Sequence, residues 1–337
     1  MASHLLAMNI ASAGPVIAVW LLRDPQQWEY GARLLRRSIA GLVAGSVLGG
    51  ALLLLPYAGM HAALARFPLD AYVYAGVELL FSAAAMGAVL WLVRGRRPAG
   101  WLAIGLGAAG ALNLLYHFPP LMAVLGELAV DSNWATAETI DRRTLLELWQ
   151  RPEVLALWAH FVAASFAVAA LAAVWPAAQP APDDQGRQRR CVRRMGLVAL
   201  AASVAQLPIG VALLATDGAP AREAMLGQHL PATLAFGASM LAGFALLQAL
   251  ASLAWGEGPR VLNRAGWLLV AVVTLMAATL RLSRDATNQG GDTASPPWKQ
   301  RSSSPSEPQA AELIARRSRP RAPFATLPAG RREACSA

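Results

Sequence analysis

Eight long apolar runs, most of them about twenty residues in length, constrain this chain more than any other feature of its sequence. A run of that length is typical of a helix that crosses the hydrocarbon core of a bilayer. We expect spans at about residues 4–22, 38–59, 71–93, 99–123, 154–176, 195–216, 229–254 and 264–281. The predicted fold class is therefore all-α, a polytopic transmembrane helix bundle of about eight transmembrane helices over residues 1–282.

Composition agrees with a membrane protein and argues against other classes. Of the 337 residues, 56% are hydrophobic and only 15% are charged, whereas a soluble domain carries roughly 25% charged residues. The net charge is +9, but the basic residues lie in loops and in the tail, so we expect no nucleic acid partner. The two cysteines form no CxxC or CxxCH motif, which excludes a zinc knuckle and a covalently attached c-type haem.

The arginines of the connecting loops predict the orientation. The first, third, fifth and seventh loops hold fourteen: Arg23, Arg33, Arg36, Arg37, Arg94, Arg96, Arg97, Arg187, Arg189, Arg190, Arg193, Arg194, Arg260 and Arg264. The other loops hold five: Arg66, Arg142, Arg143, Arg151 and Arg222. Because cytoplasmic loops are enriched in Lys and Arg, we expect a multi-pass protein of the cell inner membrane with its N-terminus outside.

Two segments outside the spans have their own signals. Residues 136–150, TAETIDRRTLLELWQ, have the pattern of an amphipathic helix that lies along the interface. Residues 283–337 form a basic tail rich in Ser, Pro and Arg, which we expect to be disordered. Eight spans would place this tail outside, although ten Lys and Arg follow from residue 281 onward, and the positive-inside rule disfavours that placement.

This topology brings all five histidines to the outer side of the membrane. They are His4, His61, His117, His160 and His229. His160 lies in an apolar span that holds no other ionisable group, where a polar side chain usually faces a cavity or a ligand. Neutral imidazole is a common metal ligand and the usual axial ligand of haem iron. The alternative is an interfacial histidine that forms a hydrogen bond with a neighbouring helix.

Glu78 is the second polar residue that an apolar span has to accommodate. It lies about two turns inside the third span. A carboxylate at that depth becomes neutral unless it meets a cation, a metal or a proton path. Glu78 is thus either a functional carboxylate, on a proton path or close to haem, or a protonated residue near the interface.

Several of these segments together resemble subunit I of the cytochrome bd-type quinol oxidases. The likeness covers roughly residues 1–215. It rests on His4 in HLLAMN, Glu78 in AGVELLF, the Asn113 to Pro119 stretch NLLYHFP, and the layout LLELWQRPEVLALWAHFVAASF. In that layout His160 occupies the position of a histidine that ligates a b-type haem. The resemblance therefore implies a haem-binding helix bundle.

The chain also departs from that family. Met86 stands where the family has a second glutamate, the loop between the sixth and seventh spans is short, and the apolar part ends early. The long quinol-binding loop and the regions for the remaining haem ligands have no counterpart here. These departures argue against full oxygen reduction and favour a shortened, divergent relative with a reduced haem set.

The function that the resemblance implies is electron transfer by one or two b-type haems in a respiratory or quinol-linked complex. His160 and His4 are the expected ligands of haem iron, and His117, His61 and His229 are further candidates for cofactor binding. Glu78 is the candidate catalytic carboxylate. The expected partners are the lipid bilayer, a quinol or an extracytoplasmic electron carrier, and a second membrane subunit. The alternative is a haem-free transporter or assembly subunit that retains the same fold.

Overall fold

The computed structural model describes residues 1–54, 58–175, 185–216 and 218–293, and these residues form helices and no strand. The long helices are α1 (Ala2–Leu22), α2 (Trp28–Leu53), α4 (Leu69–Leu92), α5 (Trp101–Val130), α7 (Pro152–Val174), α8 (Gln185–Thr216), α10 (Leu230–Ala254) and α11 (Pro259–Thr293). The short ones are α3 (Ala58–Ala65), α6 (Arg142–Trp149) and α9 (Ala219–Glu223). The all-α fold class is confirmed. The predicted tail lies outside the described residues, apart from the end of α11.

Seven of these helices are long and apolar enough to cross a membrane, and α2 is the long helix of the described chain that falls short. The expected span 38–59 is displaced, because α2 begins at Trp28 and ends at Leu53. Its first turns carry Arg33, Arg36 and Arg37. The apolar part after Arg37 covers only about 24 Å at 1.5 Å per residue, less than the ~30 Å hydrocarbon core.

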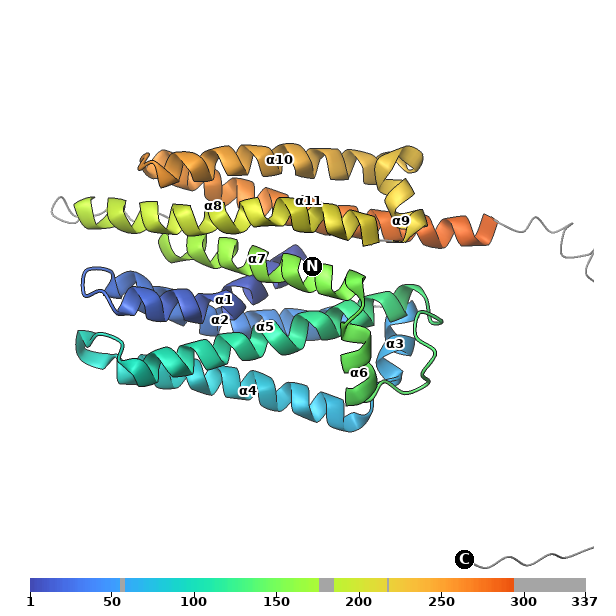
Figure 1. Ribbon diagram of the computed structural model, residues 1–337, viewed down its shortest axis with the longest axis horizontal. Helices are drawn as coiled ribbons and strands as arrows, with labels where there is room; N and C mark the ends of the chain where they lie inside the picture. The colour runs from blue at the N-terminus through green and yellow to red at the C-terminus, as the bar shows by residue number, and fades with distance from the viewer. Residues whose placement is uncertain (55–57, 176–184, 217, 294–337) are drawn as a thin grey trace, which may run out of the picture. The chain divides into compact units, whose positions relative to one another are not determined.

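Helix α1 lies at the centre of the compact unit Met1–Asn288 and packs against α2, α5 and α7 (Figure 1). Glycines permit the close approach of α1 and α2. A Cβ atom at Gly31 would lie 2.7 Å from the carbonyl oxygen of Ala18, and one at Gly14 would collide with Ser38. The buried core follows this contact, with Leu21, Leu22 and Leu34 almost fully enclosed.

The connections that hold most of the arginines gather at one end of the bundle, on the left in Figure 1. There the amide of Ala99 donates a 3.0 Å hydrogen bond to Leu22, and the Trp28 indole donates to the carbonyl of Arg97 at 3.2 Å. Arg194 Nη1 lies 3.3 Å from Asp24 Oδ2. We call this the arginine-rich end. The compartment that it faces stays a prediction.

The opposite end is covered by α3, α6 and α9 (Figure 1). Arg66 donates to the carbonyls of Ser132, Ala135 and Ala137 and so holds the segment before α6 in place. The carboxylate of Asp141 caps α6 by accepting a 2.8 Å hydrogen bond from the Thr144 amide. Hydrogen bonds from the backbone and side chain of Thr144 lower the pKa of Asp141. The predicted amphipathic helix is therefore present as α6, with Leu148 buried and Leu146 exposed.

Helix α11 returns the chain to the end that α6 covers. Arg284 Nη2 lies 3.7 Å from Glu127 Oε1 at the C-terminal end of α5. Arg281 pairs with Asp285 of its own helix, also at 3.7 Å. Both arginines near the end of α11 therefore have a carboxylate partner.

Candidate functional site

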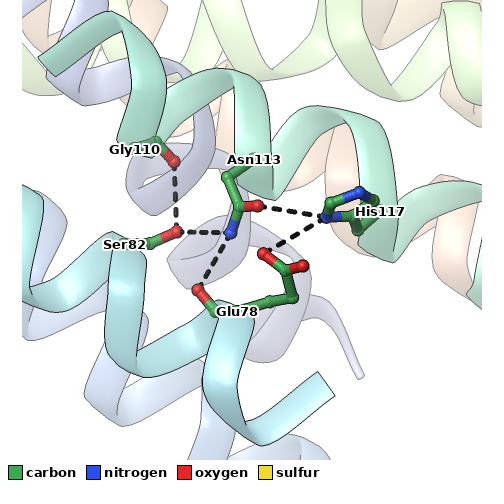
Figure 2. A network of polar contacts seen from close by, with 5 residues as sticks. All are labelled: Glu78, Ser82, Gly110, Asn113 and His117. Carbon is green, nitrogen blue, oxygen red and sulfur yellow. Dashed lines mark hydrogen bonds and ion pairs between the residues drawn. The ribbon is translucent and has the colours of Figure 1, made fainter. Parts of the chain in front are cut away.

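Polar side chains of α4 and α5 form a connected network within two apolar helices (Figure 2). Ser82 Oγ donates to the carbonyl of Gly110 at 3.2 Å. Asn113 Nδ2 donates to the carbonyl of Glu78 at 2.9 Å and to Ser82 Oγ at 3.0 Å. His117 Nδ1 lies 3.0 Å from Asn113 Oδ1 and 3.4 Å from Glu78 Oε2. We call these five residues the α4–α5 network.

Helical spacing explains how the sequence builds this network. Glu78 and Ser82 are four residues apart on α4, as are Asn113 and His117 on α5, so each pair shares a helix face. Gly110 lets the two faces meet, because a Cβ atom there would already lie 3.3 Å from the Cβ atom of Ala85. Ser82 is fully buried in this contact.

The hydrogen bonds fix the orientation of Asn113 and the tautomer of His117. Because Asn113 Nδ2 donates to two oxygen atoms, Oδ1 is the atom that faces His117 and can only accept. His117 Nδ1 must therefore carry a proton. In the neutral ring Nε2 is then the free basic atom, and its protonation would place a positive charge beside the Glu78 carboxylate. The side chains of His117 and Glu78 are 42% and 31% exposed, so the pair is accessible at the protein surface.

His4 lies in the contact between α1 and α2. Its Nδ1 atom is 2.8 Å from the carbonyl oxygen of Gly45, so Nδ1 carries the proton and Nε2 retains its lone pair. Gly49 lies directly against the ring, since a Cβ atom there would be 2.8 Å from His4 Cε1. A backbone carbonyl that orients an imidazole in this way is a common support for a ligating histidine.

His160 lies in α7 with its Nδ1 atom buried and without a hydrogen bond partner. His229, which precedes α10, has a buried Nδ1 atom in the same state. His61 is exposed on α3. The described residues contain no group of three or more His, Cys, Asp or Glu that could hold a metal ion. Of the predicted site residues, His117 and Glu78 are in contact, at 3.4 Å between Nδ1 and Oε2.

An apolar groove of about 540 Å³ runs between α7 and α8. Its walls include Trp158, Ala163, Phe166, Ala201 and Ile209, and His160 does not line it. A second buried polar contact joins α7 to α1, where Ser165 Oγ donates to Asn9 Oδ1 at 2.7 Å. The polar groups of α7 thus face different neighbours.

Sequence reasoning identified Glu78 and His117 but missed Ser82 and Gly110, which complete the network. The Glu78 and Ser82 spacing was a usable signal, because both are polar on one face of an apolar helix. Comparisons with known protein families, curated proteins and solved structures find no match to this chain.

Proposed function

We propose that this chain is a haem-b membrane protein of electron transfer, in which His160 and His4 supply ligands to haem iron. One observation carries the proposal: the Nδ1 atom of His160 is buried without a hydrogen bond inside an apolar span. An unpaired buried polar atom costs free energy, about 1–3 kcal/mol in soluble proteins. A ring nitrogen bound to iron would no longer be unpaired.

His4 suits the same chemistry for a different reason. Its proton is held on Nδ1 by the carbonyl of Gly45, which leaves the Nε2 lone pair available to a metal. Haem iron needs only one or two axial donors, so the lack of a larger metal-binding cluster among the described residues does not conflict with it. Bound haem would supply the one-electron chemistry. The chain's own residues would orient the imidazoles and exclude water from them.

The α4–α5 network adds a place for a proton. In a medium of low dielectric constant, a change in charge at one site is most easily accommodated when a proton moves with it. His117 Nε2 is the ring atom with a lone pair, and Glu78 Oε2 lies 3.4 Å from Nδ1 of the same ring. We assign this proton-holding role to His117 and Glu78.

Absorption spectroscopy of the purified protein tests the proposal. Protein produced in haem-sufficient cells and purified in detergent is expected to show a Soret band and, after reduction, an α-band of the b type. The His160→Ala variant is expected to lose most of the signal of its haem. His61→Ala is the matched control, because His61 is exposed on a short helix and its removal should leave the spectrum unchanged. A colourless wild-type preparation would contradict the proposal.

A second candidate, a haem-free proton-coupled transporter, is favoured by the partly exposed Glu78 and His117 pair within membrane-spanning helices. Ionisable residues inside such helices often mark proton or substrate paths. The same preparation separates the two candidates, because a transporter of this kind would be colourless and unaffected in its spectrum by His160→Ala.

A further inference from the structure

The arginine-rich end has far more positive charge than its own carboxylates can balance. Fourteen arginines occur in the segments that meet there, against Asp24, Glu29 and Glu257 among the described residues. Asp183 and Asp184, which precede α8 in the chain, lie outside the described residues. Even when both are counted, the arginines outnumber the carboxylates by nine.

Few of these arginines form ion pairs within the described chain. Arg96 pairs with Glu29 at 2.6 Å and Arg194 pairs with Asp24 at 3.3 Å. Arg37 is directed inward, where it donates to the carbonyls of Ala172 and Trp175 at the end of α7. Exposed arginines without a carboxylate partner in the described segments include Arg36, Arg94, Arg97, Arg193, Arg260 and Arg264.

The opposite end of the bundle is different. Four of its arginines lie within 4.0 Å of a carboxylate: Arg143 of Glu147, Arg151 of Glu153, Arg281 of Asp285 and Arg284 of Glu127. Carboxylates of the described chain thus pair with most of the arginines at this end, whereas they pair with only a few at the arginine-rich end. Among the described residues, the excess of arginines over carboxylates therefore belongs to the arginine-rich end.

Exposed tryptophans place these arginines at the height of lipid headgroups. Trp101, at the start of α5, is 81% exposed, and Trp255, at the end of α10, is 82% exposed. Exposed Trp side chains of membrane proteins concentrate at the interface between hydrocarbon and water. Arg97 and Arg260 lie four and five residues from these tryptophans in the chain. Arginine next to such a belt can reach the phosphodiester groups of the adjoining leaflet.

We infer that the arginine-rich end binds the headgroups of anionic phospholipids, which supply the counter-charges that the protein lacks. The guanidinium group donates two parallel hydrogen bonds to a phosphate, and anionic lipids add a net charge that zwitterionic lipids do not have. This inference does not depend on the proposed haem. It requires only a bilayer with an anionic leaflet at this end.

Quenching of tryptophan fluorescence by brominated lipids tests the inference in reconstituted vesicles. The full-length protein is placed in phosphatidylcholine vesicles that contain either brominated phosphatidylglycerol or brominated phosphatidylcholine, and the relative binding constant is obtained from the quenching. A basic residue near an anionic surface contributes about fivefold in binding. We expect phosphatidylglycerol to be preferred at least fivefold at low salt, with the preference decreasing as salt is added.

A pair of matched triple variants locates the effect. Arg36→Gln, Arg193→Gln and Arg264→Gln together change exposed arginines of α2, α8 and α11 and should lower the preference at least fivefold. The control combines Arg142→Gln, Arg143→Gln and Arg222→Gln at the other end and should leave the preference within about twofold. No preference in the wild type, or equal losses in both triple variants, would overturn the inference.

Discussion

Replacing Asn113 with Ala tests whether the α4–α5 network holds its two helices together. The side chain makes two hydrogen bonds to α4, to the Glu78 carbonyl and to Ser82 Oγ, and one to His117 within α5. Hydrogen bonds between side chains of neighbouring membrane helices average about 0.6 kcal/mol, with a maximum near 1.7. Two such bonds predict that Asn113→Ala lowers the free energy of unfolding by about 1–2 kcal/mol.

Reversible unfolding in mixed micelles, followed by circular dichroism, measures this change. A double-mutant cycle with Ser82→Ala should give a coupling energy of about 0.6 kcal/mol, since Asn113 and Ser82 share one hydrogen bond. Asn263→Ala is the control, because Asn263 is exposed on α11 and has no hydrogen bond partner in the described chain. If Asn113→Ala is no more destabilising than Asn263→Ala, the network does not stabilise the pair of helices.

Two further predictions concern other contacts. Gly31→Ala places a methyl group 2.7 Å from the Ala18 carbonyl oxygen and should lower the free energy of unfolding by about 1–3 kcal/mol in the same assay. The control is Gly50→Ala, whose added methyl group meets open space and should be neutral or stabilising. Equal effects of the two substitutions would refute the close contact of α1 and α2. The pKa of Asp141 is lowered by hydrogen bonds from Thr144, so the carboxylate stabilises α6 above its unfolded-state pKa, and this stabilisation is lost as the pH falls through the folded-state value. The α6 amides of the wild type should therefore lose protection from hydrogen exchange at acid pH, after correction for the intrinsic exchange rate. In the Asp141→Ala variant these amides should be less protected at neutral pH, and acid should change their protection less.

The transmembrane helices could be predicted because hydropathy is a property of each segment alone. The displaced second span shows what hydropathy does not predict, which is where a helix begins. The apolar residues up to Leu54 and beyond place the hydrophobic run late in the sequence, whereas α2 begins earlier and includes Arg33 and Arg37. Hydropathy does not show that Arg37 donates hydrogen bonds to carbonyls at the end of α7. Which helices are neighbours decides where such a helix starts, and sequence periodicity does not contain that information.

Individual residues of the candidate site could be predicted from the sequence, but the contacts between its helices could not. His117 and Asn113 could be placed on one helix face from their spacing, and Glu78 could be recognised as an unusual carboxylate. Their contact could not, because it depends on α4 packing against α5 at the height set by Gly110. The unpaired Nδ1 atom of His160 was also invisible in the sequence, since only the surrounding helices determine whether a nitrogen atom finds a partner.

The close contact of α1 and α2 has a consequence for biogenesis. A translocon releases a segment into lipid according to its own apolar length and charge, and α2 alone offers a short apolar stretch after three arginines. Only a few residues connect α2 to α1, whose apolar stretch is longer and sufficient to cross a membrane. We expect α1 and α2 to enter the bilayer as one helical hairpin, because the contact with α1 would compensate for the short apolar stretch of α2. Gly31 and Gly14, which permit the close contact, would then act already during insertion, before the remaining helices are present.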